Sequence, residues 1–351
     1  MIPLDAGEFR KKFVLEKSEK IGDSVRLLND HGLRMVLVVE GECRLAGVIT
    51  DGDIRRGLIR GLNLESPLAD VMKTKPLVVT REVGASLAKQ IMVANRIYHL
   101  PVVDPEGSLL GIHLLDEPDQ KLQHSEVFVV MAGGKGKRLW PHTQNCPKPM
   151  LPVNGKPMLQ HILERAREDG FHRFMLAVNY LGKIIEDYFG NGSNFGVEIE
   201  YLREDQPLGT AGALSLMESP PDSSVIVTNG DVLTDIKYSD IVNFHKRYGA
   251  KATMAVRQYE WQHPFGVVRT NGMEIIGFDE KPVTRTHINA GIYILEPEMF
   301  GLLTRNMHCD MPELFIKAQN FRHKTMAYPM HEPWLDVGRP VDLEKANEGN
   351  I

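Results

Sequence analysis

The sequence is poor in the features that mark secreted and nucleic-acid-binding proteins. Its three cysteines, Cys43, Cys146 and Cys309, lie far apart and show no metal-ligand spacing. They exclude a framework of several disulfides, and we expect reduced thiols in a reducing compartment. The formal net charge is −5, and no dense run of Lys and Arg is present. A nucleic-acid partner is therefore disfavoured, and any phosphate-binding site must be local.

Long apolar stretches are also missing. The N-terminal segment contains no apolar signal core, and no apolar run approaches the length that spans a bilayer. We therefore expect a cytoplasmic protein without a membrane partner. What is present is an ordinary globular composition, with 42% hydrophobic and 25% charged residues over 351 positions. A chain of this length is long enough to form two domains.

The first third of the chain contains an internal repeat. Residues 33–47 align without gaps on residues 97–111. The matching positions are Val38 with Val102, Val39 with Val103, Glu42 with Glu106, Leu45 with Leu109, and Gly47 with Gly111. Each copy has an apolar helical stretch, a short β-type run, a polar turn and a second short strand. This pattern predicts an α+β pair of repeats, at about 9–61 and 68–118.

The first copy ends in the stretch GVITDGDIRR, residues 47–56. This stretch resembles the fingerprint of the cystathionine-β-synthase-type (CBS) domain pair. The resemblance implies that Thr50 and Asp53 hold the phosphate and ribose of a regulatory adenine or guanine nucleotide. The second copy departs from the pattern, with Leu114 and Glu117 at the matching places. Such pairs often associate, so we expect a homo-oligomer.

The chain changes character after a polar, proline-containing segment at residues 117–124, which we interpret as a linker. From residue 126 onward, β-type runs alternate with helical stretches at the spacing of βαβ units. This alternation predicts an α/β domain with a mainly parallel, Rossmann-like sheet, whose ligands lie beyond the carboxyl ends of the strands. The predicted domains are residues 1–120 and 125–351.

A glycine-rich loop follows the first strand of this second domain. It runs from Ala132 to Arg138 and contains Gly133, Gly134 and Gly136. Glycines let the backbone turn tightly and point consecutive N–H groups at an anion, and the loop lysines and arginine add positive charge. A triphosphate fits such a loop, although the loop alone also fits a plain tight turn. Its spacing is not the GxGxxG of dinucleotide-binding proteins.

Three further charged residues stand in distinctive surroundings. Lys148 lies between prolines in NCPKPMLPV, on a stiff extended segment from which it can reach a phosphate. Asp231 follows a buried strand directly, where parallel sheets keep their ligands, and Asp336 lies in WLDVG far downstream. Taken singly, each aspartate also fits a helix N-cap or a turn.

The combined run from AGGKGKR to PKPMLPV closely resembles the signature of sugar-1-phosphate nucleotidyltransferases, and the resemblance extends over residues 127–351. It implies a GT-A-like fold in which Asp231 and Asp336 hold Mg²⁺. Two carboxylates, phosphate oxygens and water suit this hard octahedral ion. The same resemblance implies nucleotide-binding roles for Ala132, Gly133, Gly134, Gly136, Gln206, Gly209 and Thr210. It implies sugar-phosphate-binding roles for Gly266, Glu280, Lys281 and Asn289.

The reaction implied by this resemblance is an attack of a sugar phosphate oxygen on the α-phosphorus of a nucleoside triphosphate. Arg138 then stabilises the departing pyrophosphate, Lys148 holds the α-phosphate and Lys281 holds the sugar phosphate. The segment LGTAGAL resembles guanylyltransferases, which favours GTP. Together with a CBS pair, it resembles the glucosamine 1-phosphate guanylyltransferases of bacterial legionaminic acid biosynthesis. Mannose 1-phosphate and heptose 1-phosphate are the alternative substrates, and a non-catalytic nucleotide sensor is the remote alternative.

Overall fold

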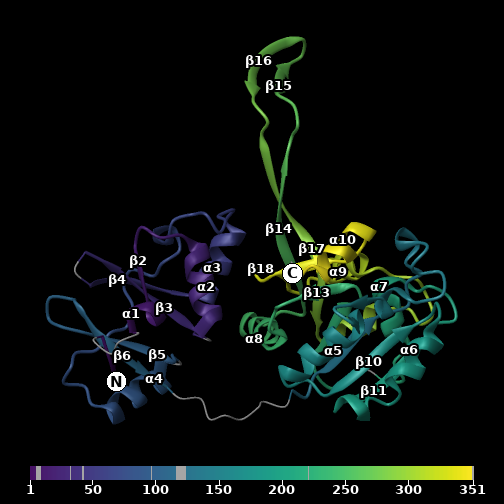
Figure 1. The fold of residues 1–351 in the computed structure, drawn as a ribbon, viewed down its shortest axis with the longest axis horizontal. Helices are drawn as coiled ribbons and strands as arrows, with labels where there is room; N and C mark the ends of the chain where they lie inside the picture. Colours follow the sequence, from purple (N-terminus) through teal and green to yellow (C-terminus); the bar gives the residue numbers. More distant parts are fainter. Residues whose placement is uncertain are drawn as a thin grey trace. The chain divides into compact units, whose positions relative to one another are not determined.

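The computed structural model describes residues 1–4, 9–31, 33–41, 43–95, 97–115, 124–219 and 221–349. The chain divides into two compact units, Met1–Gln120 and Lys121–Ile351 (Figure 1). The predicted linker lies outside the described residues except for His124, and so does Glu117. In the described part of the chain, no helix is long and apolar enough to cross a membrane.

The N-terminal unit is built from two similar halves, each with a three-stranded sheet, β2-β3-β4 and β1-β6-β5. Both hairpins carry a register shift at equivalent points, between Val38 and Val39 in one and between Val102 and Val103 in the other. The repeat seen in the sequence is therefore also a structural repeat. Its elements are β1 (Ile2–Pro3), α1 (Phe9–Phe13), β2 (Val14–Glu16), α2 (Ile21–His31), β3 (Met35–Glu40), β4 (Arg44–Thr50), α3 (Asp51–Ile59), α4 (Ala85–Asn95), β5 (His99–Val103) and β6 (Leu109–Leu114).

The C-terminal unit contains a seven-stranded sheet in the order β11-β10-β7-β12-β17-β14-β18. Strands β7, β10, β11 and β12 are parallel, and only β17 runs antiparallel to both of its neighbours. The predicted α/β class with a mainly parallel sheet is thus confirmed. The strands of the sheet are β7 (Val127–Met131), β10 (Arg173–Val178), β11 (Glu198–Arg203), β12 (Val225–Asn229), β14 (Ala252–Gln262), β17 (Val283–Leu295) and β18 (Thr325–Met330).

Helices cover both faces of this sheet, and each face has its own apolar core. In β7, Phe128 and Val130 join one core while Val127 and Val129 join the other. Burial on both faces explains the continuous apolar run VFVVM, because neither side of such a strand meets water. The helices of the unit are α5 (Met158–Glu168), α6 (Gly182–Phe189), α7 (Gly209–Gly212), α8 (Tyr238–Tyr248), α9 (Met311–Asn320) and α10 (Pro340–Asn347).

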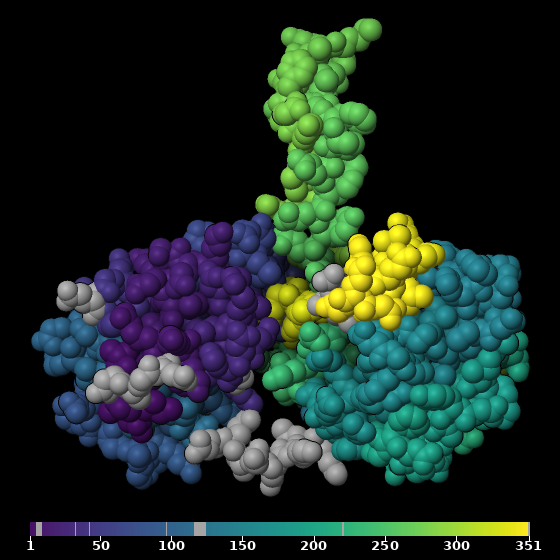
Figure 2. Space-filling view, in the orientation of Figure 1, coloured from purple at the N-terminus to yellow at the C-terminus, as the bar shows by residue number. Residues whose placement is uncertain are grey.

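Two strands of the sheet continue far beyond it as a β arm, residues 258–287. Strands β14 and β17 stay paired as far as Gln262 opposite Val283. The arm closes with the small hairpin of β15 (Val267–Asn271) and β16 (Glu274–Asp279). Figures 1 and 2 show the arm projecting from the rest of its unit. Neither these strands nor their departure from the sheet was predicted from the sequence.

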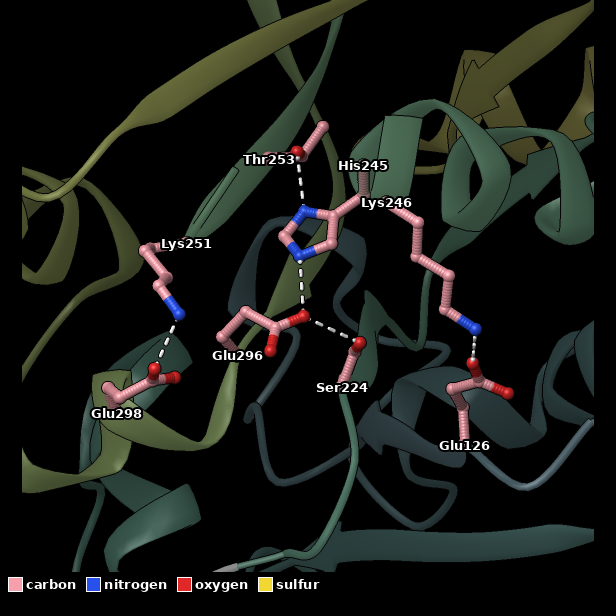
Figure 3. Close-up of polar contacts among 8 residues, drawn as sticks. All are labelled: Glu126, Ser224, His245, Lys246, Lys251, Thr253, Glu296 and Glu298. Atoms are coloured by element: carbon pink, nitrogen blue, oxygen red, sulfur yellow. Dashed lines mark hydrogen bonds and ion pairs between the residues drawn. The ribbon is translucent and has the colours of Figure 1, made fainter. Parts of the chain in front are cut away.

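A network of buried polar groups lies where β12, β14 and β17 meet α8 (Figure 3). The ring of His245 contacts Thr253 Oγ1 at 2.8 Å and Glu296 Oε1 at 3.0 Å, and Ser224 donates to the same carboxylate at 2.8 Å. Burial lowers the pKa of His245, which favours the neutral ring, and Nε2, which faces the Glu296 carboxylate, is then the nitrogen that donates. Close by, the carboxylate of buried Glu126 lies 3.6 Å from His124 Nδ1 and forms an ion pair with Lys246. The contact with His124 and the one with Lys246 together outweigh desolvation and lower the pKa of Glu126 to about 2.

We expect Glu126 to contribute to acid stability. Its pKa falls from 4.5 to about 2 on folding, so its stabilisation is fully present above pH 4.5 and is lost as the pH falls toward 2. The shift corresponds to roughly 3 kcal/mol as an upper figure. Glu126→Gln should therefore lower the free energy of unfolding at pH 7 and flatten its decline between pH 5 and pH 3, as measured by urea denaturation. Glu298→Gln, which removes an exposed ion pair with Lys251, is the control and should change little. An unchanged pH profile in Glu126→Gln would contradict this role.

Candidate active site

A cleft lies at the carboxyl ends of two neighbouring strands of the sheet. Strands β7 and β12 are parallel, with Met131 opposite Asn229, so the loops that follow them meet. The Gly230 N–H donates to the Met131 carbonyl at 2.9 Å and ties the two loops together. The cleft has a volume of about 260 Å³. Its lining comprises Met131, Ala132, Gly133, Gly134, Lys148, Pro149, Glu204, Pro207, Gly209, Thr210, Asn229, Gly230 and Asp231.

Two carboxylates and one buried lysine converge beside this cleft. The Nζ atom of Lys148, a residue only 8% exposed, forms an ion pair with Asp231 and lies 4.0 Å from Asp336 Oδ1. A short antiparallel pair, β13 (Val232–Thr234) with β19 (Trp334–Asp336), brings the aspartates together. Burial raises the pKa of Asp336, as does Asp231, while Lys148 and Arg138 oppose the shift.

The two aspartates offer hard oxygen donors on one side of the cleft. No cluster of three or more metal-ligating side chains occurs in the described ranges, so Asp231 and Asp336 alone would leave most of an octahedral shell to other oxygens. Their shared contact with Lys148 shows that a positive charge is already accommodated between them. This donor set fits Mg²⁺ bound together with phosphate oxygens and water.

The glycine loop brings its backbone close to the cleft. A methyl group on Gly133 would lie 2.8 Å from Glu204 Oε1 and 3.2 Å from Asn179 Cβ, so a larger residue there would displace Glu204, whereas Gly134 faces open space. Gly136 packs against Lys148, where a methyl group would lie 3.0 Å from its Cβ atom. Arg138 is exposed, and its guanidinium has no ion pair or hydrogen bond in the part of the chain that the structure describes. It is therefore available to a ligand.

The far side of the cleft contains a residue that sequence reasoning missed. Glu204 Oε2 accepts a hydrogen bond from the Leu208 N–H at 2.9 Å, and burial raises the pKa of its carboxyl group. Asn229 was also missed, and its buried Oδ1 atom has no hydrogen-bond partner among the described residues. The sequence signal for both was only their position, in EDQPLG and in NGD, next to residues that we singled out.

The predicted base-binding segment has mixed roles in the structure. Thr210 lines the cleft, but its hydroxyl contacts Asp310 Oδ1 at 3.3 Å and accepts the Met311 N–H at 2.8 Å, which ties it to the start of α9. Gln206 donates to the Asn306 carbonyl at 3.2 Å and is not among the residues that line the cleft. Thr210 thus has a structural role, because it joins this segment to α9.

Gly209 leaves no room for a side chain. Its φ of +79° is in the left-handed region, and a methyl group would lie 2.7 Å from Asp310 Oδ1 and 2.8 Å from the Cys309 carbonyl oxygen. We expect Gly209→Ala to lower the free energy of unfolding by about 3 kcal/mol, from backbone strain plus overpacking. Gly249→Ala is the matched control, because its φ is +56° but nothing lies within 4 Å; it should cost about 1 kcal/mol. Equal losses in urea denaturation would contradict the contribution of the contact with Asp310.

The predicted sugar-phosphate residues are separated in the structure. Asn289 lies at the base of the β arm, where it donates to the Tyr293 hydroxyl at 2.8 Å. Gly266, Glu280 and Lys281 lie out on the arm, and a methyl group on Gly266 would lie 3.1 Å from Glu280 Oε2. The structure therefore groups these arm residues with each other and not with the cleft of their own unit.

The predicted regulatory residues of the N-terminal unit have a local structural role. The backbone N–H and the hydroxyl of Thr50 donate to Asp53 Oδ2, at 3.0 and 2.6 Å, at the start of α3. Asp53 also forms an ion pair with Arg56. These contacts stabilise the helix start. Nucleotide binding at Thr50 and Asp53 stays a prediction.

Comparisons with known proteins agree with this arrangement. The nucleotidyl transferase family model matches residues 127–350, and the CBS domain model matches residues 6–60 and 68–112. A UTP–glucose-1-phosphate uridylyltransferase from Synechocystis is 36% identical over 242 residues, which are 63% of this chain and 62% of that protein. A mannose-1-phosphate guanylyltransferase from Mycobacterium tuberculosis is 32% identical over 231 residues, 64% of each chain. The chain thus spans less than two thirds of the length of these relatives.

Solved structures show the same fold. The crystal structure of HddC from Yersinia pseudotuberculosis is similar with a TM-score of 0.50 and 25% identity, covering 64% of this chain and 99% of that one. The family match covers the sheet, the glycine loop and both aspartates of the cleft. The chain therefore belongs to the nucleotidyl transferase family, and two CBS domains precede its transferase domain.

Proposed function

We propose that this chain transfers a nucleoside monophosphate from a nucleoside triphosphate to a sugar 1-phosphate and releases pyrophosphate. The observation that carries this proposal is the convergence of Lys148, Asp231 and Asp336 beside a glycine loop and an exposed Arg138. These groups provide cations and carboxylates that can bind a metal, around a cleft that the glycine loop lines. Such a site suits a reaction that places two phosphorylated substrates next to each other.

In the proposed reaction, a sugar phosphate oxygen forms a bond to the α-phosphorus, and the bond from this phosphorus to the bridging oxygen of pyrophosphate breaks. The nucleophile is already anionic, so the protein needs no strong general base and acts by positioning and charge neutralisation. Mg²⁺ on Asp231 and Asp336 would supply charge compensation for the triphosphate. Lys148 holds the α-phosphate, and Arg138 stabilises the leaving pyrophosphate.

Among the nucleotides, we favour GTP, and among the sugars glucosamine 1-phosphate, as in the supply of legionaminic acid. The segment LGTAGAL and the CBS pair support this choice. The relative from M. tuberculosis is named for mannose 1-phosphate and guanylyl transfer, which supports GTP, whereas the Synechocystis relative is named for UTP. Mannose 1-phosphate and heptose 1-phosphate are the next candidates. We place the enzyme in the cytoplasm.

Pyrophosphate release tests the proposal. The purified protein with Mg²⁺ is incubated with each nucleoside triphosphate against glucosamine, mannose, glucose and heptose 1-phosphates. Release with GTP and glucosamine 1-phosphate is the expected result. Release with another pair would keep the reaction and replace the substrates. Nucleotide binding without release for any pair would favour the non-catalytic sensor and overturn the proposal.

The CBS pair adds a second proposal, that an adenine or guanine nucleotide bound through Thr50 and Asp53 regulates the transferase. Regulation of this kind requires the nucleotide to bind two states of the protein with different affinity. Calorimetric titration of the full chain with AMP, ADP, ATP, GDP and GTP is compared between the wild type and Asp231→Asn, which separates regulatory from cleft binding. Saturation with no site beyond the cleft would overturn this proposal.

A further inference from the structure

The β arm exposes an unusual amount of apolar surface. Phe265 is 76% exposed and Phe278 is 71% exposed, and the neighbouring Met273, Ile275 and Ile276 are exposed as well. In Figure 2 the arm stands clear of the rest of its unit. A two-stranded ribbon is only marginally stable in water, and contiguous apolar surface of this kind marks an interaction site. The arm therefore needs a surface that covers it.

The arm also carries residues that its own cleft cannot use in this structure. Asn289, at the base, pairs with Val256, and the strand then continues outward to Val283 opposite Gln262. At about 3.4 Å per residue, Val283 lies roughly 20 Å from Asn289, and Lys281 lies farther still. A lysine side chain on its four-carbon stem is much shorter than this span. Lys281 thus does not reach the phosphates of its own cleft.

Lys281 nevertheless has two features that are typical of functional residues, an uncommon backbone conformation and a charge that is unpaired among the described residues. Its φ is +43°, a left-handed conformation that is uncommon outside glycine and is found preferentially at functional sites. It forms no ion pair within the described ranges of the chain, and its neighbour Glu280 lies beside Gly266. A free cation and a carboxylate acceptor side by side suit a phosphorylated sugar. At the cleft, by contrast, Lys148 is already paired with Asp231.

We infer that the β arm serves the cleft of a second copy of this chain. Two copies exchange arms about a twofold axis, and Lys281 and Glu280 of each copy complete the sugar-phosphate half of the other copy's cleft. The exchange is reciprocal, so it closes as a dimer. This inference rests on the proposed function, because it assigns the arm residues to the sugar phosphate.

The surroundings of the cleft favour a second copy as the occupant. Trp140, 52% exposed, follows the glycine loop, and Met307, 58% exposed, has its backbone oxygen next to Gly212 at the end of α7. The glycine loop and α7 both contribute residues to the lining of the cleft, so these exposed side chains lie on elements next to it and offer apolar contacts to Phe265 and Phe278 of an incoming arm. A different partner would cover the arm but would leave the cleft without Lys281.

Complementation between two inactive variants tests the exchange. Lys281→Ala and Asp231→Asn are co-expressed with different affinity tags, and oligomers that carry both tags are purified. Each variant alone should lose turnover by about 100-fold or more. In a mixed dimer, one of the two sites combines an intact arm with an intact cleft, so we expect about half of the wild-type turnover per dimer.

Wild-type turnover is established first in the same assay, which keeps the two proposals separate. If the wild type turns over but the mixed dimers are as inactive as the single variants, each arm serves its own cleft or another surface, and the exchange is overturned while the proposed function stands. Failure to recover any doubly tagged oligomer would overturn the exchange as well.

Phe265→Ser with Phe278→Ser should raise the KM for the sugar phosphate, whereas Phe321→Ser, exposed outside the arm, should not. An unchanged KM in the arm variant would contradict the docking of its apolar end.

Discussion

Replacing Asp231 by Asn is expected to reduce pyrophosphate release by about 100-fold or more at saturating substrates and Mg²⁺. The variant keeps the shape of the side chain but removes its charge. The cleft then loses one of two carboxylates available to a divalent cation, and the buried Lys148 loses its ion-pair partner. Because Asp336 is 4.0 Å from the same lysine, it cannot replace Asp231 without rearrangement.

Asp235→Asn is the matched control for this variant. Asp235 lies a few residues further along the chain and forms an exposed ion pair with Arg165 outside the cleft. An exposed pair contributes little, so turnover should stay within about twofold of the wild type. Thermal unfolding of both variants separates a loss of chemistry from a loss of folded protein. Normal turnover by folded Asp231→Asn would show that this carboxylate does not hold the metal.

Much of the C-terminal unit could be predicted because short stretches of its sequence specify its elements. A buried strand followed at once by a polar signature places that signature at the carboxyl edge of a parallel sheet. Strands β7 and β12 are each followed directly by such a signature, and the structure brings Gly133 and Asp231, one from each signature, to one cleft. The repeat in the N-terminal unit was visible for the same reason, since equivalent positions recur at a fixed spacing.

The remaining features depend on pairing between distant segments, which local patterns do not encode. Asp336 approaches Lys148 beside the cleft because β19 pairs with β13, and nothing near Asp336 in the sequence specifies this register. Glu204 belongs to the cleft because the fold buries it beside Gly133 of the glycine loop. The β arm is a further case, because no strand was predicted at residues 252–262 or 283–295 and no local pattern shows that such a pair leaves the sheet. Lys281 was therefore predicted as a site residue without an indication of whose cleft it serves.

Arg138→Ala should cause a loss in turnover comparable to that of Asp231→Asn, about 100-fold or more, with almost no loss of stability. Arg138 is exposed and has no ion pair or hydrogen bond in the described part of the chain, so its removal breaks no strong contact of the folded protein. If the guanidinium acts on charge that develops on the leaving pyrophosphate, kcat and kcat/KM should fall together. Arg138→Lys should recover only part of the rate, because an ammonium group lacks the planar fork that binds two phosphate oxygens.

Lys137→Ala shows whether position or net charge is responsible. Lys137 is exposed and adjacent in the same loop, so its loss changes the local charge by the same amount. Long-range electrostatics between exposed groups are screened by salt over about 10 Å at 0.1 M. A general field effect would therefore make the two variants similar and would shrink at high salt. A directed contact would leave Lys137→Ala within a few-fold of the wild type and keep the loss in Arg138→Ala at every salt concentration. We expect the second pattern, because stabilisation of a departing phosphate oxygen requires a donor at a fixed place, and a loop that merely attracts anions does not supply one.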